Sequence, residues 1–332
     1  MTAFADIIRG PEFGLIERTQ AISTTEHVPQ EISTWLPWNT KGVAFQTVAI
    51  EEKDGNIGLI ETQPVGAPAP RIEVDSRKIR TLNVPRYPVE ISVRGSEVQG
   101  VRKFNSDNDV ETVTETLGDK EKSARKRHDA TLEFARAGAV SGLIKDRDGS
   151  TIYDLYSEFG VARIDRTIDF ASSSTDIADV LTDLKHEAED ELGGFLITGW
   201  QWICTKSVFK AASTHASVRE AFKFFQTGFA VSDKSKGFTL SDDVQLRSYH
   251  KGKLNGQTFL TEGDSFLCPI IDDFYQTRFA PSEAFPNTIG LPLYAIPAQV
   301  PDKYGMQFDE LVESYHVSWA SRPRGIIRIR AA

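Results

Sequence analysis

The strongest constraint on this chain is a helical stretch from Asp119 to Leu143. It contains no proline and is rich in residues that favour helix. At about 1.5 Å per residue it is ~37 Å long, which is long for a compact domain and suits a strut. The residues that predict its buried face are Ala124, His128, Leu132, Ala135 and Ala139. Gly118 is expected to break or kink the helix just before this stretch.

Residues 43–82 predict a long two-stranded β-ribbon. A β-rich run at 43–50 is followed by the turn signal Asp54-Gly55-Asn56 and by a second short run. Three prolines between 63 and 70 exclude a helix or a central strand, and 71–82 then alternates as an extended chain. The ribbon has few apolar residues for a core of its own, so it is expected to lie on another subunit.

This ribbon is the candidate functional site, a clasp between subunits. Its candidate contact residues are turn formers and arginines: Asp54, Gly55, Pro64, Gly66, Pro68, Pro70, Arg71, Arg77 and Arg80. No catalytic, cofactor-binding or metal-binding residue is predicted.

The other segments predict an arm and two mixed units. Residues 1–36 are poor in apolar residues and predict an extended arm. Asp148-Gly149-Ser150 predicts a turn, and Gly193-Gly194 ends an amphipathic helix that begins near Ile177. The elements expected after that helix are a buried strand at 195–204, a helix at 206–225, short strands at 244–249, 258–260 and 265–268, and terminal strands within 314–330.

The length of 332 residues is consistent with about two domains. The predicted divisions are an N-terminal arm at 1–36, the extended loop at 37–90, a first domain at 91–193, a second domain at 194–312 and terminal strands at 313–332, which return to the first domain.

Composition excludes several classes of protein. A net charge of −9 argues against a protein that coats nucleic acid. Two cysteines, Cys204 and Cys268, are too few for a disulfide framework and are expected to be reduced and buried. The first residues lack the features of a signal peptide, and the apolar stretch at 195–204 is too short to span a membrane. A cytoplasmic site of synthesis is therefore expected.

Patterns that could carry catalysis are weak. Neither a phosphate-binding loop nor a dinucleotide fingerprint is present. The segment His186–Asp190 lacks the second histidine of a zinc helix, and no signature pairs a cysteine with His215 or His250. The basic run 120–127 is most simply a solvated helix face, and the alternation at 322–330 fits a strand better than a nucleic-acid tail. The chain is not predicted to be an enzyme.

Several stretches, in order, resemble the lambda-type major capsid proteins of tailed phages, the capsid protein E family. Phe45–Glu51, followed by Ile57–Ile60 and Val65–Pro68, resembles the extended loop of that family, and Asp129–Ile144 resembles the end of its long helix. Segments 148–160, 280–297 and 313–329 resemble later parts of the same family. The resemblance implies an α+β, tailed-phage (Hong Kong 97-like) capsid fold with an N-terminal arm, an extended β-ribbon loop, a long-helix peripheral domain at 91–193 and an α/β axial domain at 194–312.

The resemblance also implies a function. It predicts a major capsid protein whose hexamers and pentamers form an icosahedral shell around double-stranded DNA, without a cofactor. Its expected partners are copies of itself, scaffold and portal proteins, possible decoration proteins and, by weak contact only, packaged DNA. No membrane contact is expected, and the expected location is the virion after assembly in the host cytoplasm. A nanocompartment shell of the same fold and a hydrolytic enzyme of unrelated fold remain alternatives.

Overall fold

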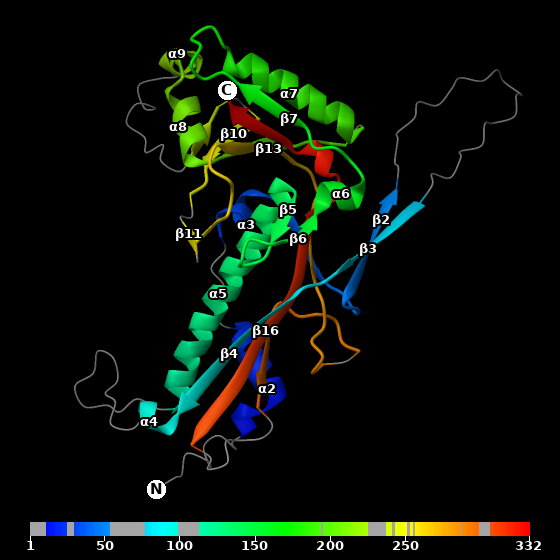
Figure 1. Cartoon of the computed structure of the whole chain (residues 1–332), viewed down its shortest axis with the longest axis vertical. Helices are drawn as coiled ribbons and strands as arrows, with labels where there is room; N and C mark the ends of the chain where they lie inside the picture. The colour runs from blue at the N-terminus through cyan, green and yellow to red at the C-terminus, as the bar shows by residue number, and fades with distance from the viewer. Residues whose placement is uncertain are drawn as a thin grey trace, which may run out of the picture.

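The computed structural model shows an elongated molecule with two main sheets joined by one long helix (Figure 1). The structure describes residues 11–24, 30–53, 77–98, 113–193, 195–224, 237–240, 243–250, 253–254, 256–285, 287–298 and 306–332. Helices and strands both contribute to both halves, so the predicted α+β class is confirmed.

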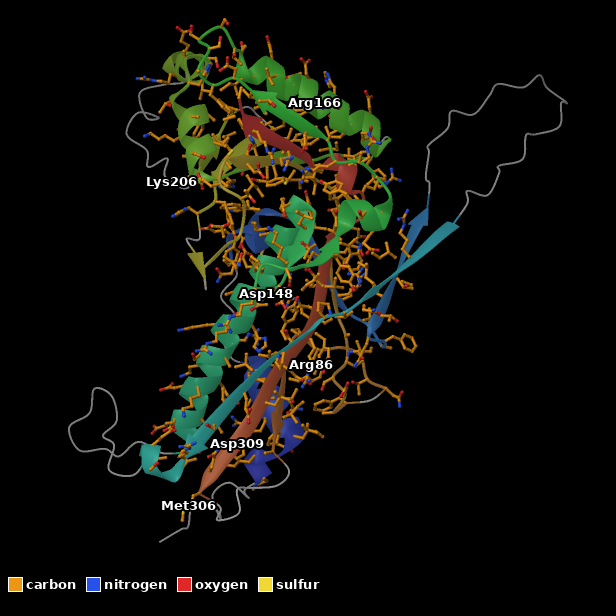
Figure 2. All side chains as sticks on the ribbon, in the orientation of Figure 1. Arg86, Asp148, Arg166, Lys206, Met306 and Asp309 are labelled. Carbon is orange, nitrogen blue, oxygen red and sulfur yellow. The ribbon has the colours of Figure 1, made fainter. Side chains whose placement is uncertain are left out.

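A five-stranded sheet forms the narrow half of the molecule (Figure 1). Its strands are β1 (Trp38–Gly42), β4 (Arg86–Arg94), β14 (Tyr275–Phe279), β15 (Tyr294–Pro297) and β16 (Gln307–Ala320). Strand β16 organises the sheet, because its first part pairs with β4 and β15 and its last part pairs with β14, all antiparallel. The ion pair between Arg86 and Glu313, 2.7 Å apart, links β4 to β16 (Figure 2).

Helix α5 (Val113–Ser141) lies along this sheet (Figure 1). Its 29 residues make it about 43 Å long. The predicted break at Gly118 is wrong: the helix continues through this residue, because one interior glycine weakens a helix by only about 1 kcal/mol. Leu132, predicted on the buried face, is only half-buried, whereas the neighbouring Glu133 is fully buried.

A six-stranded mixed sheet forms the other half. Its strands, in spatial order, are β7 (Asp165–Ile168), β17 (Ile327–Ala331), β13 (Asp264–Ile270), β8 (Gly199–Cys204), β10 (Val244–Ser248) and β9 (Gly237–Thr239). One face packs on α7 (Ile177–Leu192), α8 (Lys206–Thr214) and α9 (Ala216–Phe224). The other face packs on α3 (Glu31–Trp35) and the end of α5.

Sheet membership differs from the predicted divisions at two places. Strand β7 and helix α7, predicted to lie with the long helix, belong to the six-stranded unit together with β8. Strand β17, predicted to return to the first domain, pairs instead with β13 and β7. The reason is burial: Ile327 and Ile329 on β17 pack in the same core as Leu181 and Trp202.

The N-terminal region also differs from its prediction. Within 11–24 and 30–36 the chain is not an extended arm but forms η1 (Pro11–Phe13), α2 (Leu15–Thr24) and α3. Ile22 on α2 is fully buried with Ala124 and Ala295, and the Thr19 hydroxyl donates to the carbonyl of Ala295 over 3.0 Å. A few well-placed contacts therefore hold a segment whose average composition is polar.

The remaining elements are short. They are the strand pair β2 (Thr47–Lys53) and β3 (Arg77–Asn83), the hairpin β5 (Leu143–Lys145) and β6 (Thr151–Asp154), the pair β11 (Lys253–Leu254) and β12 (Gln257–Thr258), and the helices α4 (Gly95–Val98), α6 (Leu155–Phe159) and η2 (Pro323–Gly325). The predicted turn at Gly149 joins β5 to β6 at a φ of 88°, which favours glycine.

Candidate assembly surface

The predicted ribbon begins as an antiparallel pair of strands. β2 and β3 pair from Thr47 opposite Asn83 to Lys53 opposite Arg77. Figure 1 shows this pair directed away from both main sheets. The two-stranded prediction is therefore confirmed at the root of the ribbon.

Most of the predicted clasp residues lie beyond that root. Asp54, Gly55, Pro64, Gly66, Pro68, Pro70 and Arg71 lie outside the described residues. Arg77 is the first residue of β3, and Arg80 stands opposite Ile50 in the strand pair. Their role as a clasp stays a prediction.

Apolar side chains fix the root of the ribbon to its own subunit. Val48, Ile50 and Leu82 are buried in one cluster with Leu155 and Phe159. Each such side chain contributes about 1.5–3 kcal/mol when it is fully removed from water. The root is therefore a firm support for whatever lies beyond it.

Polar contacts also hold strand β3 against the body of the subunit. The Arg80 guanidinium donates to the carbonyl of Glu158 and lies 5.6 Å from the centre of the Phe159 ring. The Tyr153 hydroxyl donates to the Asn83 carbonyl over 2.9 Å and accepts from the Asn83 amide over 3.0 Å. These contacts of Arg80 are made within its own subunit, whereas the sequence pattern predicts that Arg80 contacts a neighbouring subunit.

Three large apolar side chains are exposed next to the ribbon root. Phe45 is 74% exposed, Ile289 67% and Leu291 41%. The amide of Gly290 donates to the Val43 carbonyl over 2.9 Å, which holds the two loops side by side. Single exposed apolar residues are common, but three on two joined loops form a candidate contact surface, called here the root patch.

A buried ionic cluster attaches α2 to the long helix. Arg18 donates from Nε to Glu310 over 2.9 Å and from Nη2 to Glu121, and all three side chains are buried. Burial, reinforced by the neighbouring Glu310, raises the pKa of Glu121 to about 8. One guanidinium thus faces two buried carboxyl groups, of which Glu121 is largely protonated at neutral pH.

Sequence reasoning missed this cluster because Glu121 lies in the basic run 120–127, which was expected to be solvated. That prediction holds for Lys122, Lys126 and Arg127, which are exposed, and is wrong for Glu121. The i, i+3 spacing of Glu121 with the buried Ala124 was the available signal.

A second buried acid on α5 holds α3. Glu133 accepts hydrogen bonds from the amides of Ile32 and Ser33, over 2.8 and 3.1 Å, and from the Ser33 hydroxyl over 2.6 Å. The Tyr249 hydroxyl donates to the same carboxylate over 3.3 Å. Because the N-cap residue Gln30 makes no side-chain capping bond, Glu133 supplies the cap from another helix.

The candidate catalytic groups considered in the sequence are not arranged as an active site. Cys204 and Cys268 are free and buried, and burial raises the pKa of both thiols. The His215 ring contacts Ser217 and the carbonyl of Ser172 rather than a thiol. In the part of the chain that the structure describes, no group of three His, Cys, Asp or Glu side chains could hold a metal ion. None of the described helices is both long and apolar enough to cross a bilayer.

Solved structures share this fold. A subunit of the mature capsid of bacteriophage PhiM1 superposes with a TM-score of 0.55 at 10% identity, over 92% of this chain and 88% of that one. A phage-related protein from Bordetella bronchiseptica RB50 gives a TM-score of 0.55 at 12% identity, over 94% and 96% of the two chains. The predicted tailed-phage capsid fold is confirmed.

Sequence comparison gives the family. The major capsid protein of Pseudomonas phage KPP10 is 24% identical over 311 residues, covering 86% of this chain and 88% of the relative. That of Salmonella phage Felix O1 is 23% identical over 365 residues and covers 96% of each chain. The family model for phage major capsid protein E matches residues 17–331. The chain therefore belongs to the phage major capsid protein E family.

Proposed function

We propose that this major capsid protein of a tailed phage closes its shell by laying the ribbon between β2 and β3 on a neighbouring copy. The observation that supports this is the root, which is packed in its own core and directs two strands away from it (Figure 1). Two paired strands alone are marginally stable, so the ribbon gains most by covering another subunit. Repetition of the contact around a closed shell then turns a weak bond into a strong one.

The root patch supports the same arrangement. Phe45, Ile289 and Leu291 lie where a neighbour held by the ribbon would meet the body of the subunit. Their burial would add to assembly at about 25 cal/mol per Å² of apolar surface removed from water.

The finer division of labour follows from the two sheets. The five-stranded sheet with α5 would be the peripheral domain, and the six-stranded unit would surround the centres of hexamers and pentamers. Scaffold, portal and possible decoration proteins are the proposed partners, with only weak contact to packaged DNA and assembly in the host cytoplasm. The chain would act as a structural subunit without catalytic activity. A nanocompartment shell is the less supported alternative, because the family and the curated relatives are phage capsid proteins.

The test replaces residues 54–70 by a short Gly-Ser linker in the full chain. We expect a folded subunit with near-native circular dichroism and no closed shells in negative-stain images. Phe45→Ser should weaken assembly less, because the ribbon remains. Met306→Ser is the matched control, since Met306 is equally apolar and 64% exposed but lies at the far end of β16 (Figure 2).

Two results would contradict the clasp. Closed shells from the linker variant would show that the ribbon is dispensable for assembly. An unfolded linker variant would show that the ribbon belongs to the core of its own subunit.

A further inference from the structure

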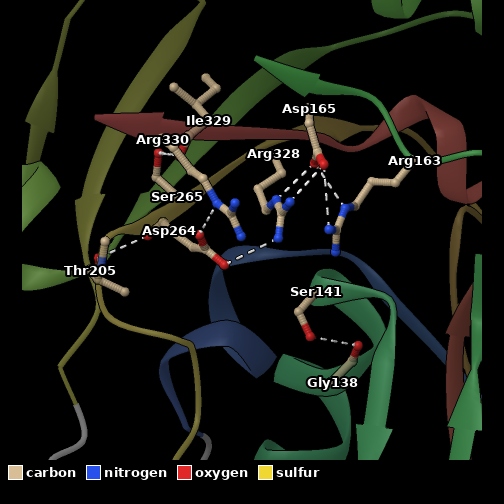
Figure 3. Close-up of polar contacts among 11 residues, drawn as sticks. Gly138, Ser141, Arg163, Asp165, Thr205, Asp264, Ser265, Arg328, Ile329 and Arg330 are labelled. Carbon is tan, nitrogen blue, oxygen red and sulfur yellow. Dashed lines mark hydrogen bonds and ion pairs between the residues drawn. The ribbon is translucent and has the colours of Figure 1, made fainter. Parts of the chain in front are cut away.

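A row of alternating charges crosses three strands of the six-stranded sheet. Its members are Arg163, Asp165, Arg328, Asp264 and Arg330, as Figure 3 shows. Strand register creates the row, because Arg328 stands beside Asp165 on β7 and Arg330 stands opposite Asp264 on β13. Since strand residues alternate between faces, Arg328 and Arg330 share one face while Ile327 and Ile329 enter the core.

The contacts within the row are short. Arg328 donates from Nε and Nη2 to the two oxygens of Asp165, over 2.7 and 2.6 Å, and its Nη1 lies 3.6 Å from Asp264. Arg330 donates from Nε to Asp264 over 2.8 Å, and Arg163 donates to Asp165 over 2.8 and 3.4 Å. Three guanidinium groups thus form ion pairs with only two carboxylates.

These groups border a cavity of about 110 Å³ between the sheet, the end of α5 and the β11–β12 hairpin. Of the residues that the structure describes, Arg163, Arg328, Arg330 and Lys145 line it together with one acid, Asp264. With Asp165, which pairs with Arg328 but does not line the cavity, the described residues place four cations beside two carboxylates, a local excess of +2 in a chain whose net charge is −9. Since a water molecule occupies about 30 Å³ in the liquid, the cavity has room for a small polyatomic ion.

Unused hydrogen-bond donors remain around this space. The ion pair of Arg330 uses its Nε, and the bonds of Arg163 use Nε and Nη2, which leaves other guanidinium N–H groups without a partner among the described residues. The side chain of Lys145 makes no hydrogen bond or ion pair with any residue that the structure describes. The hydroxyls of Thr258 and Thr261 line the same cavity. Guanidinium forks match the geometry of oxyanions, and hydrogen bonds between such charged groups are about twice as strong as neutral ones.

We propose that this cavity is a binding site for a small oxyanion, either a free phosphate or a carboxylate side chain of a second copy. An oxyanion there would contact Arg330, Arg163 and Lys145, while Asp165 and Asp264 hold the guanidinium groups in position. The competing explanation is that the cations only complement the negative C-terminal end of α5, whose last residues, Gly138 and Ser141, also line the cavity. This site does not depend on the ribbon clasp.

The test measures thermal unfolding of the full-length, unassembled subunit in inorganic phosphate, against chloride at equal ionic strength. A ligand that binds only the folded chain raises its melting temperature in step with concentration. Arg330→Gln and Lys145→Gln should each weaken the apparent phosphate affinity about tenfold or more. Arg330 is exposed at the strand end and loses only its ion pair with Asp264, and the side chain of Lys145 has no hydrogen bond or ion pair among the described residues, so the fold should survive both changes.

Arg166→Gln is the matched control. Arg166 is also a half-exposed arginine in an ion pair, with Glu187, but it does not line the cavity. We expect its phosphate response to equal that of the unchanged chain. Equal phosphate and chloride curves for the unchanged chain, or equal responses of Arg330→Gln and Arg166→Gln, would overturn the proposal and leave the cations as a support for the end of α5.

Assembled shells distinguish the two sources of the oxyanion. If the site takes free phosphate, the shell should keep the phosphate response. If a carboxylate of a second copy fills the site, the response should be present in the subunit and absent from the shell. Both outcomes support an oxyanion site, and the loss of the response in Arg330→Gln subunits is required in either case.

Discussion

Replacement of Arg18 by methionine should destabilise the subunit by about 3–5 kcal/mol, the usual cost of leaving buried charge without its partner. Among the described residues Arg18 is the one cation that pairs with Glu121 and Glu310, and the change removes both of its bonds to them. Charge-assisted hydrogen bonds contribute about 1.5–3 kcal/mol each, which gives a similar total. The Arg18 guanidinium lies 5.7 Å from the centre of the Phe13 ring, and methionine, which is long and apolar, can still pack beside that ring.

The assay is urea unfolding of the full-length subunit at pH 7, with hydrogen exchange across residues 15–24 as a local readout. Lys122→Met is the control: its ion pair with Asp119 lies on the same helix but is exposed, so the change should cost well under 1 kcal/mol.

A triple variant separates loss of charge balance from loss of packing. Arg18→Met combined with Glu121→Gln and Glu310→Gln replaces the cation and both acids by neutral side chains and should recover most of the lost stability. A cost below about 1 kcal/mol for Arg18→Met, or no recovery in the triple variant, would refute the role assigned to the cluster.

Three further predictions concern protons and thiols. Burial raises the pKa of Glu121 to about 8, so the folded chain holds a proton that the unfolded chain releases near pH 4.5. This contribution to stability is complete below pH 4.5 and is lost as the pH rises through 8. Glu121→Gln should therefore make the free energy of unfolding vary less with pH over that range. Burial lowers the pKa of His128 to about 4 and of His316 to about 3, so the unfolded chain binds protons at a higher pH than the folded chain does. Below pH 6.5 each histidine should therefore lower the free energy of unfolding by up to about 1.4 kcal/mol for each pH unit. His316→Phe should reduce this slope when unfolding is measured at a series of acidic pH values. Cys204 and Cys268 should react with a thiol reagent only in urea and give no reducible ladder on non-reducing gels, and such a ladder from assembled shells would show that a thiol is accessible.

Periodic apolar patterns were readable in the sequence. The helix that begins at Ile177 and ends before Gly193, and the strand that carries Ile327 and Ile329, occur as predicted. Such patterns depend on neighbours a few residues away, so the local sequence contains the needed information. The antiparallel strand pair at the root of the ribbon was likewise predicted from local sequence patterns.

Contacts between distant segments were not readable. Arg18 reaches Glu310 across 292 positions, and Glu133 caps a helix 100 positions earlier. A charged residue is expected at the surface unless its partner is known, so Glu121 and Glu133 were assigned to solvent or left aside. Strands β17 and β7 belong to the six-stranded unit because they pair with each other, and this pairing joins residues more than 160 positions apart.

The two kinds of anchor on this subunit should respond differently to conditions. The ribbon root is held chiefly by buried apolar side chains, whose contribution does not depend on pH. Helix α2 depends in addition on Glu121, whose bond to Arg18 changes with protonation because burial raises the pKa of this carboxyl group to about 8. The root of the ribbon should therefore stay protected as the pH rises through 8, a range over which the contribution of Glu121 to the attachment of α2 is lost, and hydrogen exchange at 47–50 and at 15–24 would separate the two.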